Sequence, residues 1–176
     1  MNAWHDIKIE RITPNKFVAV VEIEKQSKNK YELDKESGLL ILDRILHTST
    51  HYPANYGFIP KTLAEDDDPL DVLVLCSEAI KPLCMVECYP IGVISMSDGG
   101  VADDKIIAIP FNDPNWNFYQ DLTDLPKHLI EEIMHFFEVY KQLEHKETYV
   151  LMTQGKTGAI KIIEESLDRY NKCFNK

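Results

Sequence analysis

Long hydrophobic runs are missing from this sequence of 176 residues. The longest apolar candidates, such as residues 17–23, have the length of a strand and are too short to cross a membrane. The first residues lack a basic segment followed by an apolar one, so no secretory signal is expected. No linker rich in glycine, serine or proline divides the chain. We therefore expect a single domain over residues 1–176, located in the cytoplasm and without a membrane partner.

Positive charge and cysteine are also scarce. The 19 Lys and Arg residues are outnumbered by 29 Asp and Glu residues, which gives a net charge of -10 at pH 7. Because nucleic acids and anionic membranes require a basic surface, neither is an expected partner. The cysteines have no disulfide-like spacing, which favours reduced thiols. Cys84 and Cys88 lie in one predicted strand without a second pair, which argues against zinc.

Short β-branched or alternating segments fill the first two-thirds of the chain. They predict strands at residues 17–23, 30–34, 38–44, 70–75 and 85–96, with further strands at 105–109 and 148–152. Proline and glycine limit residues 51–57, which we interpret as a loop. Short strands at this spacing are typical of a small β-barrel.

Two amphipathic segments predict helices. In the first, Asp124 can cap the helix with Pro126 in its first turn, followed by an apolar stripe of Leu129, Ile133, Phe136, Phe137 and Tyr140. In the second, apolar residues recur at steps of three and four: Ile160, Ile163, Leu167, Tyr170 and Phe174. The predicted fold class is mainly β with α (α+β), a barrel with two packed helices.

Aspartates crowd into residues 66–72. Asp66, Asp67 and Asp68 precede Pro69, and Asp71 opens an apolar strand where burial begins. Carboxylates this close repel one another and lose hydration, unless divalent cations neutralise them. Oxygen-only ligands suit Mg2+, Mn2+ or Ca2+ rather than zinc. The run therefore predicts a divalent-metal site at the start of this strand.

Other ionisable side chains interrupt apolar segments or border loops. Taken singly, each charged residue resembles an ordinary residue at the edge of a sheet. Residues 97–105 resemble a polar hairpin turn, and each tyrosine resembles a ring packed in the core. Together they combine acids that bind metals with cations and phenols that bind oxyanions, which is what phosphoryl transfer requires. The acids are Glu22, Glu32, Asp98 and Asp103, the cations Lys30, Arg44, Lys105 and Lys141, and the phenols Tyr52, Tyr56 and Tyr140.

These motifs resemble the soluble family I inorganic pyrophosphatases, close to the compact bacterial form. The run 66–72 fits the family signature Asp-x-Asp-Pro-x-Asp, and residues 30–38 fit its early strands. Asp43-Arg44, residues 52–57 and residues 135–141 follow in the family's order. The resemblance extends from about Val18 to the last helix. One departure is Gly99, because many relatives carry an acid there.

The resemblance implies an OB-like five-stranded barrel that is often a homohexamer and hydrolyses pyrophosphate to two phosphates with Mg2+, with Mn2+ or Zn2+ as substitutes. Asp66, Asp71 and Asp103 would hold one metal, Asp71 would bridge to a second, and Asp98 with Asp103 would take a third. Glu22 and Glu32 would serve a further metal, and Asp68 would be the general base on the attacking water. The matching phosphate-binding groups are Lys30, Arg44, Tyr56, Lys105, Tyr140 and Lys141, and Tyr52 would shape the site.

General chemistry agrees with these roles. Two metals about 4 Å apart can lower the pKa of a shared water and aim it in line at phosphorus. Three alternatives remain: a calcium-binding module without catalysis, a di-iron carboxylate protein suggested by Glu132 and His135, and another metal-dependent phosphohydrolase acting on nucleotides or polyphosphate. The four candidate cations argue against calcium storage, and a di-iron bundle needs four long helices and a second Glu-x-x-His motif.

Overall fold

The computed structural model describes residues 1–174 and contains both strands and helices, as the α+β prediction requires. The strands are β1 (Phe17–Ile23), β2 (Asn29–Leu33), β3 (Leu40–Ile45), β4 (Asn55–Phe58), β5 (Asp71–Val74), β6 (Met85–Asp98), β7 (Val101–Pro110) and β8 (Thr148–Gly155). The α-helices are α1 (Lys127–Val139) and α2 (Lys156–Phe174), and the 3-10 turns are η1 (Ile9–Arg11), η2 (Leu122–Asp124) and η3 (Gln142–Glu144).

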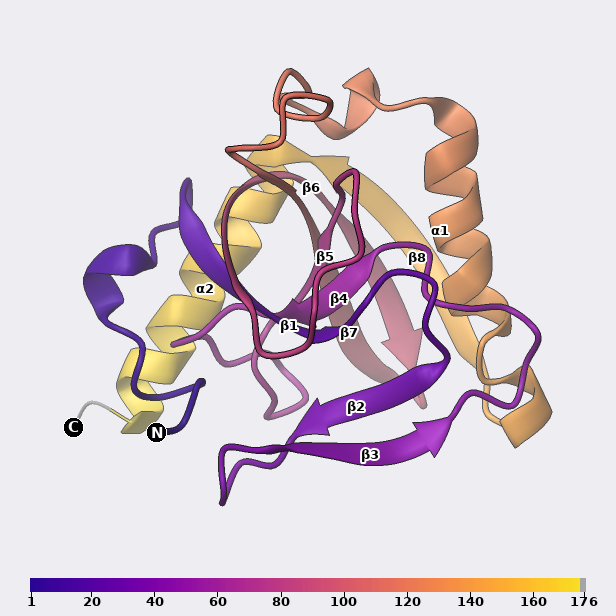
Figure 1. Cartoon of the computed structure of the whole chain (residues 1–176), viewed down its shortest axis with the longest axis horizontal. Helices are drawn as coiled ribbons and strands as arrows, with labels where there is room; N and C mark the ends of the chain where they lie inside the picture. Colours follow the sequence, from indigo (N-terminus) through magenta and orange to yellow (C-terminus); the bar gives the residue numbers. More distant parts are fainter. Residues whose placement is uncertain (175–176) are drawn as a thin grey trace.

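Five strands form a closed ring. The order β1-β4-β5-β7-β6 is completed by an antiparallel pairing between β6 and β1. Among the strands of residues 1–174, only β5 and β7 pair in parallel, and β8 extends the sheet beyond β6. Strands β2 and β3 form a separate hairpin below the ring (Figure 1). The predicted barrel of five strands therefore corresponds to this ring.

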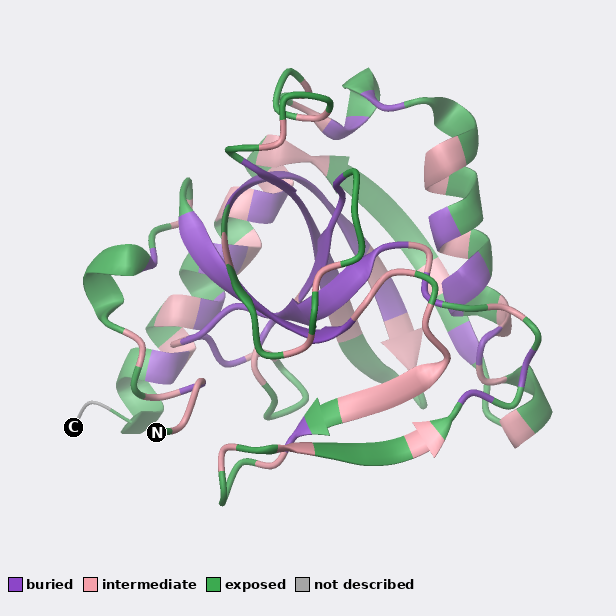
Figure 2. Ribbon diagram, in the orientation of Figure 1, coloured by how far each residue is buried: buried purple, intermediate pink, exposed green. Residues whose placement is uncertain are grey.

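Alternation along the central strands divides the core between the two helices. Leu73 and Ile107 join an apolar cluster with Phe136 of α1, whereas Val72 and Ile106 join a second cluster with Ile163 of α2. Successive side chains of a strand point to opposite faces, so both faces of β5 and β7 are covered. Figure 2 shows the largely buried strands β1, β4 and β5 beside the β2–β3 hairpin, which is partly buried along most of β2 and exposed along most of β3.

The predicted loop at residues 51–57 is wrong in its second half, because Asn55 to Phe58 form β4. The glycine that suggested a loop has a packing role, since a Cβ on Gly57 would lie 1.9 Å from the carbonyl oxygen of Val20 in β1. Glycine here permits a close approach of two backbones.

Two further local predictions need correction. Asp124 does not cap α1, because the N-cap position of this helix is Pro126. The carboxylate of Asp124 instead accepts hydrogen bonds from the backbone N–H groups of Gln120 and Asp121, which precede η2. Cys84 precedes β6, so it does not share a strand with Cys88.

The expected acidic loop at residues 97–105 is a hairpin between β6 and β7. Its turn consists of Gly99 and Gly100, with φ values of 58° and 85°. Positive φ at both central positions is the requirement of a two-residue type I′ turn. Asp98 and Asp103 therefore lie on paired strands, with their backbone positions fixed by the sheet.

Among residues 1–174, no helix is long and apolar enough to span a membrane.

Candidate active site

A polar cavity of about 340 Å³ brings together residues from distant parts of the chain. All of the predicted site residues line it except Arg44 and Tyr52. The lining members of the predicted set are Glu22, Lys30, Glu32, Tyr56, Asp66, Asp68, Asp71, Asp98, Asp103, Lys105, Tyr140 and Lys141.

The parallel pairing of β5 and β7 builds the centre of this cavity. Asp71 lies opposite Lys105 in the register, and Asp103 lies two residues earlier on the same face of β7. The ammonium group of Lys105 donates to Asp71 Oδ2 at 2.7 Å, to Asp103 Oδ1 at 2.8 Å and to the hydroxyl of Tyr56 at 2.9 Å. A cation is therefore held between two carboxylates at the first residue of β5.

Lys105 is only 2% exposed, so its charge depends on these partners. Burial alone would lower the pKa of the amine, but the facing carboxylates of Asp71 and Asp103 outweigh that effect and raise its pKa well above the usual value. Lys105 thus remains an ammonium ion inside the protein.

Several cavity carboxylates have raised pKa values. Burial raises the pKa of Glu22 to about 8, with a further contribution from the charge of Asp71. Asp66 keeps contact with solvent, yet crowding by protein atoms raises its pKa to about 6, with smaller contributions from Asp71, Asp68 and Asp103. Desolvation likewise raises the pKa of Asp103, and the charge of Lys105 opposes this shift. The cavity therefore favours arriving positive charge.

Lysines neutralise the remaining carboxylates in pairs. Lys30 contacts Glu32 at 2.5 Å, Lys141 contacts Asp98, and Lys35 contacts Asp68. Lys35 also lines the cavity, although it was not among the predicted site residues. Its position in the turn between β2 and β3, close to Lys30 and Glu32 in sequence, could have indicated a place in the site.

The donor set fits a hard divalent cation, because its acidic groups are all oxygen donors. Within residues 1–174, however, no three His, Cys, Asp or Glu side chains are grouped so that they could hold one ion together. Lys105 lies between two of these carboxylates, and Lys30, Lys35 and Lys141 each contact one, so a bound metal would replace some of these contacts.

The aromatic wall consists of Tyr56 and Tyr140, supported from behind by Tyr52. The ring of Tyr52 lies 5.1 Å from that of Tyr56 and 4.9 Å from that of Phe136 in α1. Burial raises the pKa of both Tyr56 and Tyr140, so their hydroxyls stay protonated and can donate hydrogen bonds. Tyr52 does not line the cavity; it supports a residue that does.

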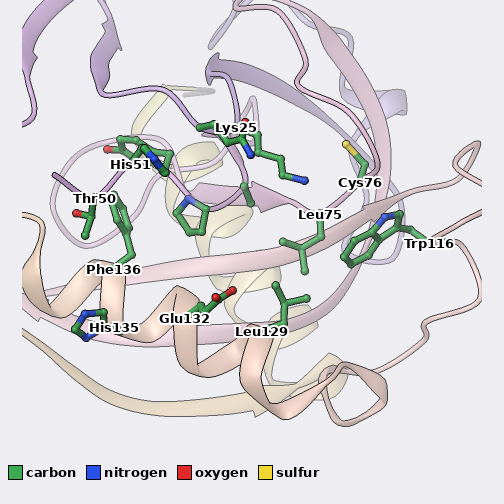
Figure 3. Close-up of a pocket in the computed structure, with 14 residues that line it drawn as sticks. Lys25, Thr50, His51, Leu75, Cys76, Trp116, Leu129, Glu132, His135 and Phe136 are labelled. Atoms are coloured by element: carbon green, nitrogen blue, oxygen red, sulfur yellow. The ribbon is translucent and has the colours of Figure 1, made fainter.

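A second cavity, of about 490 Å³, lies between α1 and the loop before β4. Its wall includes Leu75, Trp116, Leu129 and Phe136, and Glu132 contributes a carboxylate. Figure 3 shows Leu129 and Glu132 projecting from α1 toward Leu75. A mainly apolar wall does not suit a highly charged phosphate, so the smaller cavity is the candidate active site.

A closed ring of strands with carboxylates, buried cations and phenols around one polar cavity defines a protein suited to a small, highly charged anion and divalent cations. The inorganic pyrophosphatase family model matches residues 19–171. The chain belongs to the inorganic pyrophosphatase family.

Similar proteins agree over nearly the whole chain. It is 48% identical to "Soluble inorganic pyrophosphatase 2" of Chlamydomonas reinhardtii over 97% of this chain and 89% of the relative. It is 42% identical to "Inorganic pyrophosphatase" of Haloferax volcanii over 99% of both chains.

Solved structures also resemble the chain over most of its length. The inorganic pyrophosphatase of Thermus thermophilus superposes with a TM-score of 0.92 at 36% identity, covering 97% of this chain and 99% of that one. The Helicobacter pylori enzyme gives a TM-score of 0.89 at 40% identity, covering 94% and 99%. The predicted likeness to compact bacterial pyrophosphatases is thereby confirmed.

Proposed function

We propose that this chain hydrolyses inorganic pyrophosphate to two phosphates in the polar cavity. The observation that carries the proposal is the gathering of the predicted acids, lysines and tyrosines around one cavity in a chain that belongs to the inorganic pyrophosphatase family. A dianionic or more highly charged substrate needs this combination, since phosphoryl transfer depends on positioning and charge neutralisation.

The acidic side chains are proposed to hold magnesium. Asp66, Asp71 and Asp103 would hold a first ion, with Asp71 shared with a second, Asp98 and Asp103 serving a third, and Glu22 and Glu32 a further ion. When bound, divalent cations screen the charge of the substrate and make a water more acidic. Mn2+ and Zn2+ are the proposed substitutes.

The remaining residues act on substrate and proton. Asp68 accepts the proton of the attacking water, and Lys35 contacts its carboxylate. Lys30, Lys105 and Lys141 bind phosphate oxygens as ammonium ions, and Arg44 can grip one through two N–H groups. Tyr56 and Tyr140 donate hydrogen bonds from the wall, and Tyr52 holds Tyr56 in place.

We further propose one domain over residues 1–176, a cytoplasmic location and a homo-oligomer, with a hexamer as the specific expectation. Exposed apolar side chains on β8 support association: Tyr149 is 56% exposed, Leu151 65% and Met152 55%.

The test is phosphate release from pyrophosphate across a Mg2+ titration, with ATP and tripolyphosphate as competing substrates. Asp68→Asn should lower kcat by at least about a hundredfold, which is the effect expected from the loss of a general base. Asp67→Asn is the matched control, because Asp67 lies in the same acidic run and does not line the cavity.

Release that prefers pyrophosphate and depends on Asp68 supports the proposal. Release mainly from ATP or tripolyphosphate would show that the chain is a broader phosphohydrolase. No release with Mg2+, Mn2+ or Zn2+ would show that the site binds without catalysing.

A further inference from the structure

The side chain of Glu144 is buried at the edge of the candidate active site without belonging to the cavity. It lies in η3, three residues after Lys141, and only 6% of its side chain is exposed. A buried carboxylate requires a cation, since an unpaired charge is costly away from water. Its partner is Arg44 of β3, whose Nε atom lies 2.7 Å from Glu144 Oε1.

The contact leaves the guanidinium group with unused donors. Glu144 meets Nε as an ion pair without the alignment of a hydrogen bond, and Arg44 Nη2 has no hydrogen-bond partner among the described residues. Asp43 contacts the remaining nitrogen, Nη1, from the solvent side. Buried donors without partners cost free energy, which is why such a group suggests a binding role.

Arg44 also occupies a position beside the substrate-binding lysines. It is the cross-strand partner of Lys30, which lines the cavity. The β2–β3 hairpin is partly buried along β2 and mostly exposed along β3, and it pairs with no other strand among residues 1–174. The contact between Arg44 and η3 therefore ties this hairpin to the end of α1, next to Lys141.

We propose that Glu144 is a positioning residue, which fixes the guanidinium of Arg44 through Nε so that Nη2 can meet a phosphate oxygen of pyrophosphate. The inference rests on the proposed function for its substrate. Glu144 itself does not touch the substrate, because its carboxylate would repel the phosphate.

The experiment is a double-mutant cycle between Glu144→Gln and Arg44→Lys, measured by kcat and KM for magnesium pyrophosphate. A parallel measurement is calorimetric binding of imidodiphosphate, a slowly hydrolysed analogue. Glu144→Gln alone should weaken imidodiphosphate binding and lower kcat/KM by about tenfold each, with KM carrying most of the change. Combined with Arg44→Lys, it should cause no further loss, since Glu144 acts through Arg44.

Two variants serve as controls. Glu147→Gln removes a nearby exposed carboxylate that accepts a hydrogen bond from Tyr149, and should behave as wild type. Glu144→Asp keeps the charge with a shorter reach and should fall between wild type and Glu144→Gln, which also keeps the test available if the glutamine variant folds poorly.

Additive losses in the cycle, or a Glu144→Gln variant that binds imidodiphosphate as tightly as wild type, would overturn the positioning role. Absence of phosphate release from the wild-type chain would instead reject the proposed function, and the binding measurement would still report on Glu144.

Discussion

Lys105 has the most constrained environment of the candidate site residues. Its ammonium group contacts two carboxylates and a phenol while its own side chain is 2% exposed. Removing one partner of a buried ion pair leaves the other charges without compensation, and this usually costs more than the pair contributes when intact. The residue is therefore important for stability as well as for the proposed binding of phosphate.

We expect Lys105→Met to lower the free energy of unfolding by about 3 kcal/mol, in addition to its effect on phosphate release. Urea denaturation checks this value. Lys81→Met is the control: its ion pair with Glu24 is exposed, with the lysine side chain 83% accessible, and its loss should cost less than about 1 kcal/mol. Equal unfolding midpoints for the two variants would contradict the prediction.

The sequence indicated the acidic run, where the signal is local, but not the contacts that depend on strand pairing. The run Asp66 to Asp71 can be recognised in the sequence, because adjacent carboxylates beside an apolar strand are unusual. The partnership of Lys105 with Asp71 depends on the parallel register of two strands 34 residues apart in sequence. Glu144 gave no signal at all, since an acid in a polar turn normally faces solvent.

At the scale of elements, β4 shows how packing can reverse a local preference. Proline and glycine near residues 51–57 indicated a loop, but pairing on both sides with β1 and β5 makes Asn55 to Phe58 a strand. The apolar runs of β1 and β6 predicted these strands with nearly their observed bounds. For β7, only the apolar second half from Lys105 was predicted, because its polar first half at residues 101–104 resembles a loop. The first helix was also predicted, although its cap was assigned to Asp124, which lies in η2 and accepts hydrogen bonds from the backbone of Gln120 and Asp121 instead.

Gly57→Ala should destabilise the protein by at least about 2 kcal/mol, because the new Cβ would overlap the carbonyl oxygen of Val20 at 1.9 Å. The control is Gly99→Ala in the β6–β7 turn. There a Cβ meets nothing within 4 Å, and only the positive φ of 58° is unfavourable, which costs about 1 kcal/mol. Thermal unfolding measures both; a smaller loss for Gly57→Ala than for Gly99→Ala would contradict the argument.

At the scale of the whole molecule, the N-terminal segment packs against the last helix. Trp4 and His5 stack at 4.4 Å between ring centroids, and His5 Nδ1 lies 2.7 Å from the hydroxyl of Tyr170 in α2. Burial lowers the pKa of His5 below its ordinary value of 6.5, with a further contribution from Lys61 that Asp6 opposes. The lowered pKa of His5 therefore makes the stability of the protein depend on pH.

The sign follows from which state binds the proton first. As pH falls below about 6.5, the unfolded chain protonates His5 before the folded protein does, so stability decreases; above that pH both states are neutral and His5 contributes no pH dependence. The difference in unfolding free energy between wild type and His5→Phe should change between pH 7 and pH 5 and stay flat above pH 7. Taking the difference removes the opposite trend of Glu22, whose raised pKa favours the folded state at lower pH. A flat difference across the whole range would refute the role of His5.

Association should depend on the outer surface of β8. Leu151→Glu places a charge on a side chain that is 65% exposed, and should shift the protein from the proposed homo-oligomer to smaller species in light scattering. Ile9→Glu, at an exposed apolar residue of η1, should leave the molar mass unchanged. A wild-type protein that is monomeric at micromolar concentration would remove the oligomer proposal.

The closed strand ring also sets an order of events during folding. β1 begins at residue 17, but its partner β6 begins only at residue 85, and β5 needs β7, which starts at residue 101. Such distant pairings lose loop-closure entropy before they gain contacts, so the ring cannot close until β6 and β7 have formed. In pulsed hydrogen exchange during refolding, the amides of β1 should gain protection together with those of β6. Until then, a newly made chain carries β1 with an unpaired edge, exposed to other chains as it leaves the ribosome.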